Sequence, residues 1–257
     1  MSKRGRIILG AGITVFAGCI YLWFFGIQTF SMIQARRLAR QAPVVMLTPV
    51  ELSDSSISRA PGRKLSYFGY GLEIPWDDLD QQKTRVIKDD QDFAVSMISF
   101  RSGNSIAFWS TPPNGLVGKL QDKPGFDRKA LGHLIGEQAA QSDYDLQRAI
   151  LEVTPDEFSL LAPKWQALHR QLLLTMKATI LARGAEFGIY SVKTKEFQGF
   201  QYGRPQNPPK PLSVELFASD RHLDVVFGQK PNGPTIITQA DVNRIIQTIH
   251  KVPGNAN

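Results

Sequence analysis

The chain has 257 residues and a formal net charge of +7, and 42% of its residues are hydrophobic. This composition supports a packed core and excludes an intrinsically disordered chain. The single cysteine excludes an intrachain disulfide and a cysteine-rich metal site. The length suits one anchor and one soluble domain of ordinary size.

Positive charge is concentrated at the N-terminal end of the chain. Residues 1–43 contain no Asp or Glu and hold six of the 30 basic residues, namely Lys3, Arg4, Arg6, Arg36, Arg37 and Arg40. Because the other basic residues nearly balance the 23 acidic ones, the rest of the chain is close to neutral. Juxtamembrane charge attracts anionic headgroups, whereas nucleic-acid binding requires a basic face on the folded domain. We therefore expect a lipid bilayer as a partner, and no nucleic acid.

An uncharged apolar segment follows the basic N-terminus at 1–6. No charge occurs from Ile7 to Ala35, and Ile7–Ile27 is the most apolar part. As a helix rising about 1.5 Å per residue, this part would span about 30 Å, the thickness of a hydrocarbon core. We therefore predict a transmembrane helix at 7–30, which makes the chain a single-pass, signal-anchored membrane protein. A juxtamembrane helix and a linker are predicted at 31–63.

The same segment has a second interpretation around its cysteine. Phe16–Cys19 (FAGC) resembles the end of a bacterial lipoprotein signal, which would be cleaved before Cys19 and lipidated there. Ile7–Val15 alone would suit the short apolar core of such a signal, about 7–15 residues. Cleavage would leave an aromatic-rich start instead of a polar tether, and the aromatic residues at 21–25 are better placed near a headgroup boundary. The uncleaved span is favoured, and a lipoprotein anchored at Cys19 is the alternative.

The residues around and within the span bear on its orientation and contacts. Three basic residues lie on each side, so the positive-inside count is tied. Those before the span lie closest to it, so we expect a cytoplasmic N-terminus and an extracytoplasmic C-terminal domain in a bacterial-type envelope. Gly10, Thr14 and Gly18 recur every four residues. Such a stripe of small residues lets two helices approach closely, which makes self-association through the span a hypothesis.

Residues 64–252 are predicted to form a soluble α+β domain, followed by a tail at 253–257. Strand patterns occur at Leu65–Ile74, Arg85–Lys88, Phe93–Phe100, Ser105–Trp109, Phe187–Lys193, Glu196–Tyr202, Ser213–Ala218 and His222–Phe227. A compact turn at 101–104 and imperfect alternation within the strands predict an antiparallel sheet with helices packed on it. The proline-rich segment 203–211 is predicted to be an exposed loop.

Helical spacing replaces the strand pattern at about 126–183, which we interpret as a helical insertion. Thr154–Glu157 combines a cap, a proline in the first turn and a Glu three positions later, which predicts a helix start. A longer helix is predicted from Pro163 to Arg183, with one apolar face packed on the sheet. That face consists of Trp165, Leu168, Leu172, Met176 and Ile180. Thr238 is predicted to cap a last helix, whose apolar side holds Val242, Ile245, Ile246 and Ile249.

One short motif carries a family resemblance. Phe68–Trp76 (FGYGLEIPW) places glycine and aromatic residues before an alternating strand, a proline and a tryptophan. This motif resembles the opening of PsbP-like domains, and the strands at 213–218 and 222–227 with the last helix follow that family's order. The resemblance extends over about half of the chain, and the helical insertion is longer than the family pattern. It implies a fold whose members mostly bind or scaffold, and it carries over no functional residue.

No motif in the sequence predicts a catalytic, cofactor or metal site. His133 and Glu137 have the spacing of one helix face, but no third metal ligand is evident. The acidic clusters at 77–80 and 89–92 lack the frame of a calcium loop and suit turns or helix caps. The sequence also lacks a nucleophile elbow and a glycine-rich phosphate loop. We therefore expect no cofactor and no enzyme.

Two classes of function remain. A binding or scaffold protein would take another envelope protein, or a ligand that lies between the sheet and the helical insertion. A membrane-tethered hydrolase would use polar residues that only the fold brings together. A cavity that gathers His133 or His222 with carboxylates would favour the hydrolase, whereas an apolar concave region would favour binding.

Overall fold

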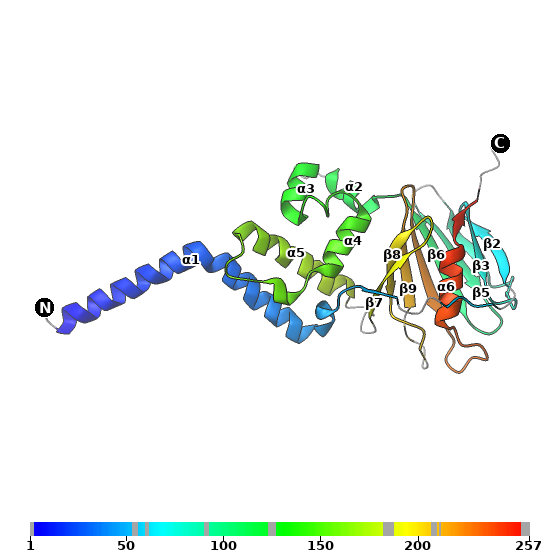
Figure 1. Cartoon of the computed structure of the whole chain (residues 1–257), viewed down its shortest axis with the longest axis horizontal. Coiled ribbons are helices and arrows are strands. Elements are labelled where there is room, and N and C mark those ends of the chain that lie inside the picture. The colour runs from blue at the N-terminus through cyan, green and yellow to red at the C-terminus, as the bar shows by residue number, and fades with distance from the viewer. Residues whose placement is uncertain are drawn as a thin grey trace.

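The computed structural model describes residues 3–52, 56–59, 62–89, 93–122, 127–181, 188–206, 210 and 212–252. Within these ranges, side chains are described from Tyr21 onward, and before it only the exposure of Gly18 is described. The predicted α+β class is confirmed: the chain forms an eight-stranded mixed sheet and a three-stranded antiparallel sheet. A helical block, which we define as residues 115–181, lies between the long N-terminal helix and the sheets (Figure 1).

The first half of the N-terminal helix α1 (Lys3–Gln41) projects away from the rest of the molecule, whereas its second half lies along α5 (Lys164–Leu181) (Figure 1). Within the described part of the chain, no helix is both long enough and apolar enough to cross a membrane. The backbone of the predicted span at 7–30 is described, but the side chains at 3–17 and 19–20 are not. The contacts predicted for Gly10 and Thr14 and the predicted lipidation of Cys19 therefore lie outside the described residues. Gly18 is exposed.

The large sheet has the strand order β1-β7-β8-β9-β10-β6-β5-β4. Its strands are β1 (Val50–Glu51), β4 (Arg85–Asp89), β5 (Ala94–Ser99), β6 (Ser105–Thr111), β7 (Ile189–Lys193), β8 (Gln198–Tyr202), β9 (Leu212–Phe217) and β10 (His222–Gly228). All neighbours pair antiparallel except β1, which pairs parallel with β7. The predicted antiparallel sheet is therefore mixed, because the segment predicted as a linker at 31–63 contributes an edge strand.

The small sheet contains β2 (Arg63–Tyr67), β3 (Tyr70–Ile74) and β11 (His250–Lys251). The pattern at Leu65–Ile74 is thus a hairpin and not one continuous strand. Phe68 and Gly69 form its turn with φ angles of 54° and 80°. A two-residue hairpin turn with positive φ at both central positions matches the twist of the flanking strands, and glycine reaches this conformation without strain.

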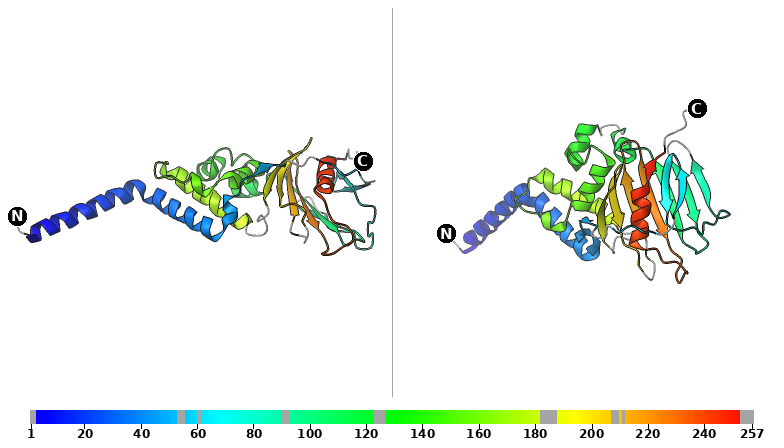
Figure 2. Two further views of the ribbon diagram at one scale, coloured as in Figure 1. Left: turned by 60° about the horizontal axis from the view of Figure 1, so that its bottom comes forward. Right: turned by 45° about the vertical axis from the view of Figure 1, so that its right-hand side comes forward.

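One face of the large sheet is covered by α6 (Gln239–Thr248) together with the small sheet, and the main hydrophobic core lies between them (Figure 2). The predicted inner side of the last helix is confirmed, since Val242, Ile245, Ile246 and Ile249 are all buried. The predicted cap is confirmed as well. Thr238 Oγ1 accepts a hydrogen bond from the Asp241 amide at 3.2 Å, and Asp241 Oδ2 accepts one from the Thr238 amide at 3.0 Å.

The helical block contains α2 (Gly115–Gln121), α3 (Arg128–Ile135), α4 (Asp143–Glu152), the 3-10 turn η2 (Pro155–Glu157) and α5 (Lys164–Leu181). The block begins earlier than the predicted residue 126, because the chain enters α2 soon after β6. Thr154 and Glu157 do form the predicted capping box, yet it starts only η2 and not a longer helix. The second half of α1 and the 3-10 turn η1 (Pro43–Met46) pack against α5 and share the core of the block.

The predicted inner face of α5 is correct only for Leu172 and Met176, which pack against the core of the helical block and not on the sheet. Trp165 and Leu168 are 62% and 52% exposed, whereas Leu173, Leu174, Leu181 and Lys177 are buried. The helix packs on α1, α3 and α4 and only its end reaches the sheet, so a different stripe faces inward. Lys177 fits there because its ammonium group donates to the carbonyl oxygen of Val153, at the end of α4, at 2.7 Å. Burial lowers the pKa of Lys177 to about 8.

The helical block packs on the second face of the large sheet, over β7, β8 and β9 (Figure 2). Leu151 and Leu181 from the block lie in one apolar cluster with Ile189 and Phe200 from the sheet. Tyr144, at the start of α4, stacks on Phe200 with ring centroids 5.5 Å apart. The two parts of the molecule thus share an apolar interface, and the residues at its margin form the site described next.

Candidate functional site: a polar cleft between the helical block and the sheet

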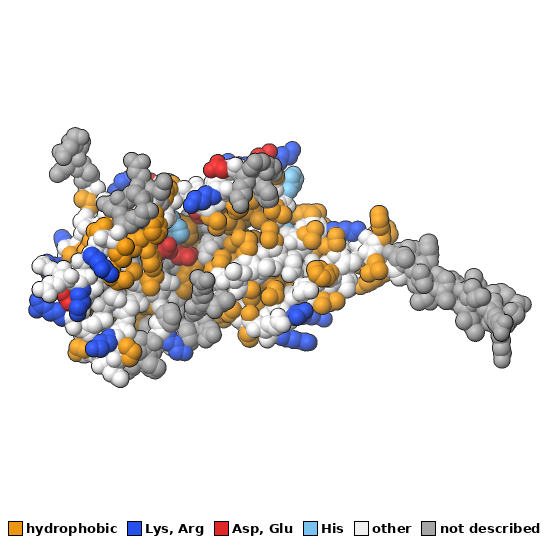
Figure 3. All heavy atoms as spheres, turned by 180° about the vertical axis from the view of Figure 1, so that it is seen from behind, with side chains coloured by type: hydrophobic (Ala, Val, Ile, Leu, Met, Phe, Trp, Pro, Cys, Tyr) orange, Lys and Arg blue, Asp and Glu red, His pale blue; other side chains and the backbone are white. Residues whose placement is uncertain are grey.

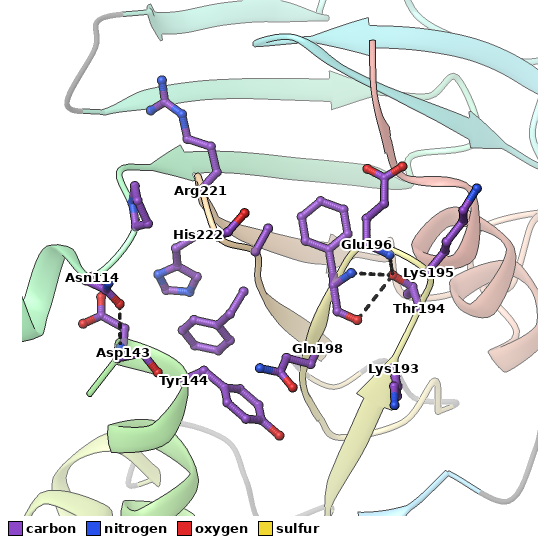
Figure 4. A pocket seen from close by; sticks show the side chains of 16 residues that line it. Asn114, Asp143, Tyr144, Lys193, Thr194, Lys195, Glu196, Gln198, Arg221 and His222 are labelled. Carbon is purple, nitrogen blue, oxygen red and sulfur yellow. Dashed lines mark hydrogen bonds between the residues drawn. The ribbon is translucent and has the colours of Figure 1, made fainter. Parts of the chain in front are cut away.

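A cavity of about 500 Å³ lies where the helical block meets one end of the sheet (Figure 4). Its walls come from three segments: the β7–β8 turn, the β9–β10 turn, and residues of the helical block with the chain that leads into it. The register explains the arrangement. His222 pairs with Thr111, so the start of β10 lies beside the end of β6, where the chain leaves the sheet for α2. We call this cavity the cleft.

The β7–β8 turn brings two lysines to the cleft. Thr194 closes the turn, since its amide donates to the Phe197 carbonyl oxygen at 2.8 Å and its Oγ1 accepts from the Phe197 amide at 3.0 Å (Figure 4). Lys193 and Lys195 lie on either side of Thr194, and both are exposed. The hydrogen bonds between Thr194 and Phe197 close the β7–β8 turn, and neither lysine takes part in them. The turn therefore presents Lys193 and Lys195 at the cleft.

The helical side of the cleft is built around a carboxylate with a structural role. Asp143 accepts hydrogen bonds from the amides of Leu116 and Val117 at 3.0 and 2.8 Å, which caps the first turn of α2. The Asp143 amide in turn donates to Asn114 Oδ1 at 3.1 Å (Figure 4). The negative charge of Asp143 is thus held by backbone donors.

His222 lies over an aromatic floor in the cleft. Its ring stacks on Phe217 with centroids 4.3 Å apart and planes 11° from parallel. Its Nε2 is 3.5 Å from Asp224 Oδ1. Burial alone would lower the pKa of His222, but the nearby carboxylates, Asp224 first and then Glu215 and Asp143, outweigh it and raise the pKa above its ordinary value. The ring is therefore protonated more readily than that of an ordinary histidine.

Behind His222, a polar network crosses from the helical block to the sheet. Gln147 Nε2 donates to the Tyr202 hydroxyl at 2.6 Å, and that hydroxyl donates to Glu215 Oε2 at 2.8 Å. Glu215 lies directly opposite Asp224 in the β9–β10 pair, so two carboxylates face each other on adjacent strands. Burial, followed by the charge of Asp224, raises the pKa of Glu215 to about 7. We call Gln147, Tyr202, Glu215, Asp224 and His222 the Glu215 network.

The candidate residues from the sequence are not brought together in the cleft. His133 lies on α3 and lines a separate cavity of about 910 Å³ with His169 and three glutamates, Glu137, Glu152 and Glu157. The expected shared helix face of His133 and Glu137 is wrong, because α3 ends at Ile135 and Gly136 turns the chain with a φ of 99°. Within the described residues, no group of three or more His, Cys, Asp or Glu could hold a metal ion.

The acidic clusters act in turns, as far as they are described. Asp78 Oδ2 accepts from the Ser102 amide at 2.7 Å, and Asp80 Oδ1 accepts from the amides of Gln82 and Lys83. Asp90 and Asp92 lie outside the described residues, as do 207–209 and 211 of the proline-rich segment. The first cluster therefore has the predicted structural role.

Sequence reasoning missed the two lysines and the paired carboxylates. One signal could have revealed the latter. Glu215 and Asp224 are equally far from the centre of the β9–β10 turn at 218–221, and an antiparallel hairpin places such positions opposite each other. No sequence pattern could have predicted that Gln147 reaches the Glu215 network or that Asp143 lines the cleft. Both residues come from the helical block, and no local pattern specifies how this block packs on the sheet.

No protein-family model, curated protein or solved structure matches the chain. The function must therefore be argued from the site itself.

Proposed function

We propose that the protein is a membrane-anchored binding protein whose cleft takes an anionic ligand. The observation that carries this proposal is the set of cations at the cleft between the helical block and the sheet. Lys193, Lys195 and Arg221 line it together with His222. The two carboxylates in its lining are already engaged, since Asp143 caps α2 and Glu196 Oε2 accepts from the Lys251 amide at 3.0 Å. The exposed ammonium groups of Lys193 and Lys195 are therefore placed to meet an anionic ligand.

The rest of the lining suits a ligand with an apolar part. Tyr144 and Phe217 meet edge to face in the cleft wall, with centroids 5.8 Å apart. Binding sites commonly combine aromatic walls with a few placed charges that fix orientation. Phosphate and carboxylate groups are the anions that lysine and arginine bind in proteins. The proposed ligand class is therefore a small organic acid or phosphate, or an acidic segment of a partner protein.

The anchor is proposed from the sequence of α1. Ile7–Ile27 carries no charge and has the length of a bilayer core, and the described side chains at its end, such as Leu22, Trp23 and Phe24, are exposed. We propose a single-pass anchor with a cytoplasmic N-terminus and the cleft on the extracytoplasmic side of an envelope. Lipidation at Cys19 and self-association through Gly10, Thr14 and Gly18 stay as predictions about the same segment.

The PsbP-like resemblance agrees with a binding role and also stays a prediction. Its motif residues fall in the β2–β3 turn, in β3 and in the segment that follows, where Trp76 packs edge to face on Phe100 at 4.9 Å. These residues belong to the main core, away from the cleft. The resemblance therefore bears on the fold and not on the ligand.

The hydrolase alternative has two observations in its favour: His133 lies in a cavity with three glutamates, and His222 lies in the cleft with two carboxylates. Two of the serine and threonine hydroxyls in the lining of the cleft are already engaged: the Ser142 hydroxyl donates to Asp145 Oδ2 at 2.6 Å, and the Thr194 hydroxyl is used within its own turn. A hydrolase at this site would have to use Ser219, on the exposed β9–β10 turn, or activate water with His222. Binding needs no such further group, and it is the function we favour.

A thermal unfolding screen of the full chain in detergent tests the proposal. The probes are inorganic phosphate, citrate, glutamate and poly-glutamate. We expect at least one to raise the melting temperature by about 5–10 °C at saturation, because binding at a hundredfold excess over Kd adds about 2.7 kcal/mol, and 1 kcal/mol shifts a chain of this size by roughly 2–4 °C. The double variant Lys193→Glu, Lys195→Glu should lose the shift.

Lys119→Glu, Lys129→Glu is the matched control, since it makes the same change of charge on exposed positions of α2 and α3. The control should keep the shift. A shift that disappears equally in both double variants, or no shift with any probe, would refute an anionic ligand in the cleft. Hydrolysis of p-nitrophenyl acetate or phosphate that His222→Gln abolishes would favour the hydrolase instead.

A further inference from the structure

A cluster of large apolar side chains is exposed where α1 crosses the beginning of α5. Leu161 is 90% exposed, Trp23 74%, Trp165 62% and Leu168 52%. We call these four residues the apolar tip. Figure 3 shows hydrophobic side chains exposed on the surface of the helical part of the molecule. A cluster of exposed tryptophan and leucine on a folded surface marks a site of interaction.

Polar contacts join α1 to the start of α5 at the apolar tip. Gln28 Nε2, from α1, donates to the carbonyl oxygen of Ala162 at 3.1 Å. The Lys164 ammonium group donates to the Trp23 carbonyl oxygen and lies 5.7 Å from the centre of the Trp23 ring. The start of α5 is therefore fixed beside one particular turn of α1, and it cannot move away while these contacts persist.

That turn of α1 lies near the end of the most apolar part of the chain, Ile7–Ile27. Trp23 falls within Ile7–Ile27, and the first basic residue after the segment is Arg36. Arg36 lies nine positions after Ile27, roughly 14 Å along the helix at 1.5 Å per residue. Arg36, Arg37 and Arg40 are exposed. The order along α1 is thus apolar residues, then tryptophan, then arginine, which is the order that a bilayer core, its interface and its anionic headgroups favour.

We propose that the apolar tip lies in the bilayer interface, so that the helical block contacts the membrane through Leu161, Trp165 and Leu168 in addition to α1. This inference rests on the proposed anchor. If the end of the apolar segment marks the bilayer boundary, the contacts of Gln28 and Lys164 bring the start of α5 to the same depth. Tryptophan favours the interface because its ring is apolar and its N–H is polar, and lysine extends its charged end towards water.

Site-directed spin labelling of the full chain tests the depth of the tip. In a Cys19→Ser background, which removes the single cysteine, a nitroxide is attached at Leu161→Cys. Leu161 is almost fully exposed, so this change leaves the packing intact. The protein is reconstituted into vesicles of phosphatidylcholine and phosphatidylglycerol. We expect the ratio of collision rates with oxygen and with a water-soluble nickel chelate to be several-fold higher for this label than for a label in water.

Ile236→Cys in the same background is the matched control, because Ile236 is a 50% exposed isoleucine on the part of the molecule that holds the sheets. Its label should be accessible to the nickel chelate. If both labels are accessible to nickel while the protein floats with the vesicles, the anchor stands and the contact of the tip is refuted. If the protein does not float with vesicles, both are refuted. Dipolar coupling between two copies labelled at 161 would show that a second chain covers the tip, which also refutes the proposal.

Discussion

Replacing Gly199 with alanine is expected to lower the free energy of unfolding by about 4 kcal/mol or more, the range in which single substitutions are exceptional. Gly199 is buried in β8, opposite Leu216 of β9. A Cβ atom at this position would lie 1.8 Å from the carbonyl oxygen of Glu215 and 3.0 Å from the Cα atom of Leu216. Backbone atoms of a central strand cannot move aside as a flexible side chain can, so β8 and β9 would have to separate.

Gly118→Ala is the control for this substitution. Gly118 lies within α2, and no atom is within 4 Å of the position that its Cβ would take. Alanine in a helix interior is favoured over glycine by roughly 0.5–1 kcal/mol, so this variant should be slightly more stable than the parent. Urea unfolding followed by circular dichroism measures both changes. Equal stability of the Gly199→Ala variant and the parent would show that β8 and β9 are farther apart than described.

Replacing Glu215 with glutamine is expected to stabilise the protein by about 3 kcal/mol well above pH 7, and to have little effect below pH 4.5. The pKa of this carboxyl is raised from 4.5 to about 7, and each unit of pKa corresponds to about 1.4 kcal/mol. The Glu215 side chain is only half-buried, so the gain of about 3 kcal/mol is an upper bound. Glutamine keeps an oxygen that can accept the hydrogen bond from Tyr202 while it removes the charge opposite Asp224.

The direction of this change in stability follows from the number of protons that the folded and unfolded states bind. Between pH 4.5 and 7 the folded protein holds a proton on Glu215 that the unfolded chain has lost, so the stability of the parent falls as pH rises through this window. His222, whose pKa is raised, acts in the same direction from pH 6.5 upward, because its stabilising charge is lost as the ring deprotonates. The Glu215→Gln variant should lack the fall in stability that comes from Glu215. The pKa of His222 should be lower in this variant than in the parent, because the charge of Glu215 helps to raise it.

Denaturant unfolding at a series of pH values, with the parent and Glu215→Gln in parallel, measures this difference. Glu137→Gln is the control, since Glu137 is exposed on the far side of the helical block. Its pH profile should overlie that of the parent. If Glu215→Gln also overlies the parent, the pKa of the Glu215 carboxyl is not raised in the folded protein.

The sequence was a good guide to elements with a strong local signal. The strands of the large sheet from β4 to β10 lie close to their predicted ranges, because alternation and turns are local features. The cap at Thr238 was equally visible. The failures come from tertiary packing. Nothing local distinguishes the stripe of Trp165 and Leu168 from the stripe of Leu173 and Leu174, and burial of Lys177 depends on a carbonyl group supplied by α4.

The site was less accessible to sequence reasoning than the fold. Its cations come from a turn, its histidine from the start of a strand, and Asp143 from the helical block, so no spacing along the chain relates them. Only the Glu215 and Asp224 pair could have been found, by counting outward from a hairpin turn. The expected place for a ligand, between sheet and helical insertion, does coincide with a cavity.

Strand β1 has a practical consequence for producing the protein without its anchor. A fragment beginning at residue 64, where the domain was expected to start, would lose Val50–Glu51 from the edge of β7, and also Ala35 and Val45 from the core of the helical block. We expect such a fragment to aggregate on size-exclusion chromatography, because β7 would become an open edge and α5 would lose its cover. A fragment beginning near Gly26 would keep these contacts and should elute as one species. The first half of α1 is thus the proposed tether, whereas its second half is part of the fold. The boundary between these two roles falls inside a single helix.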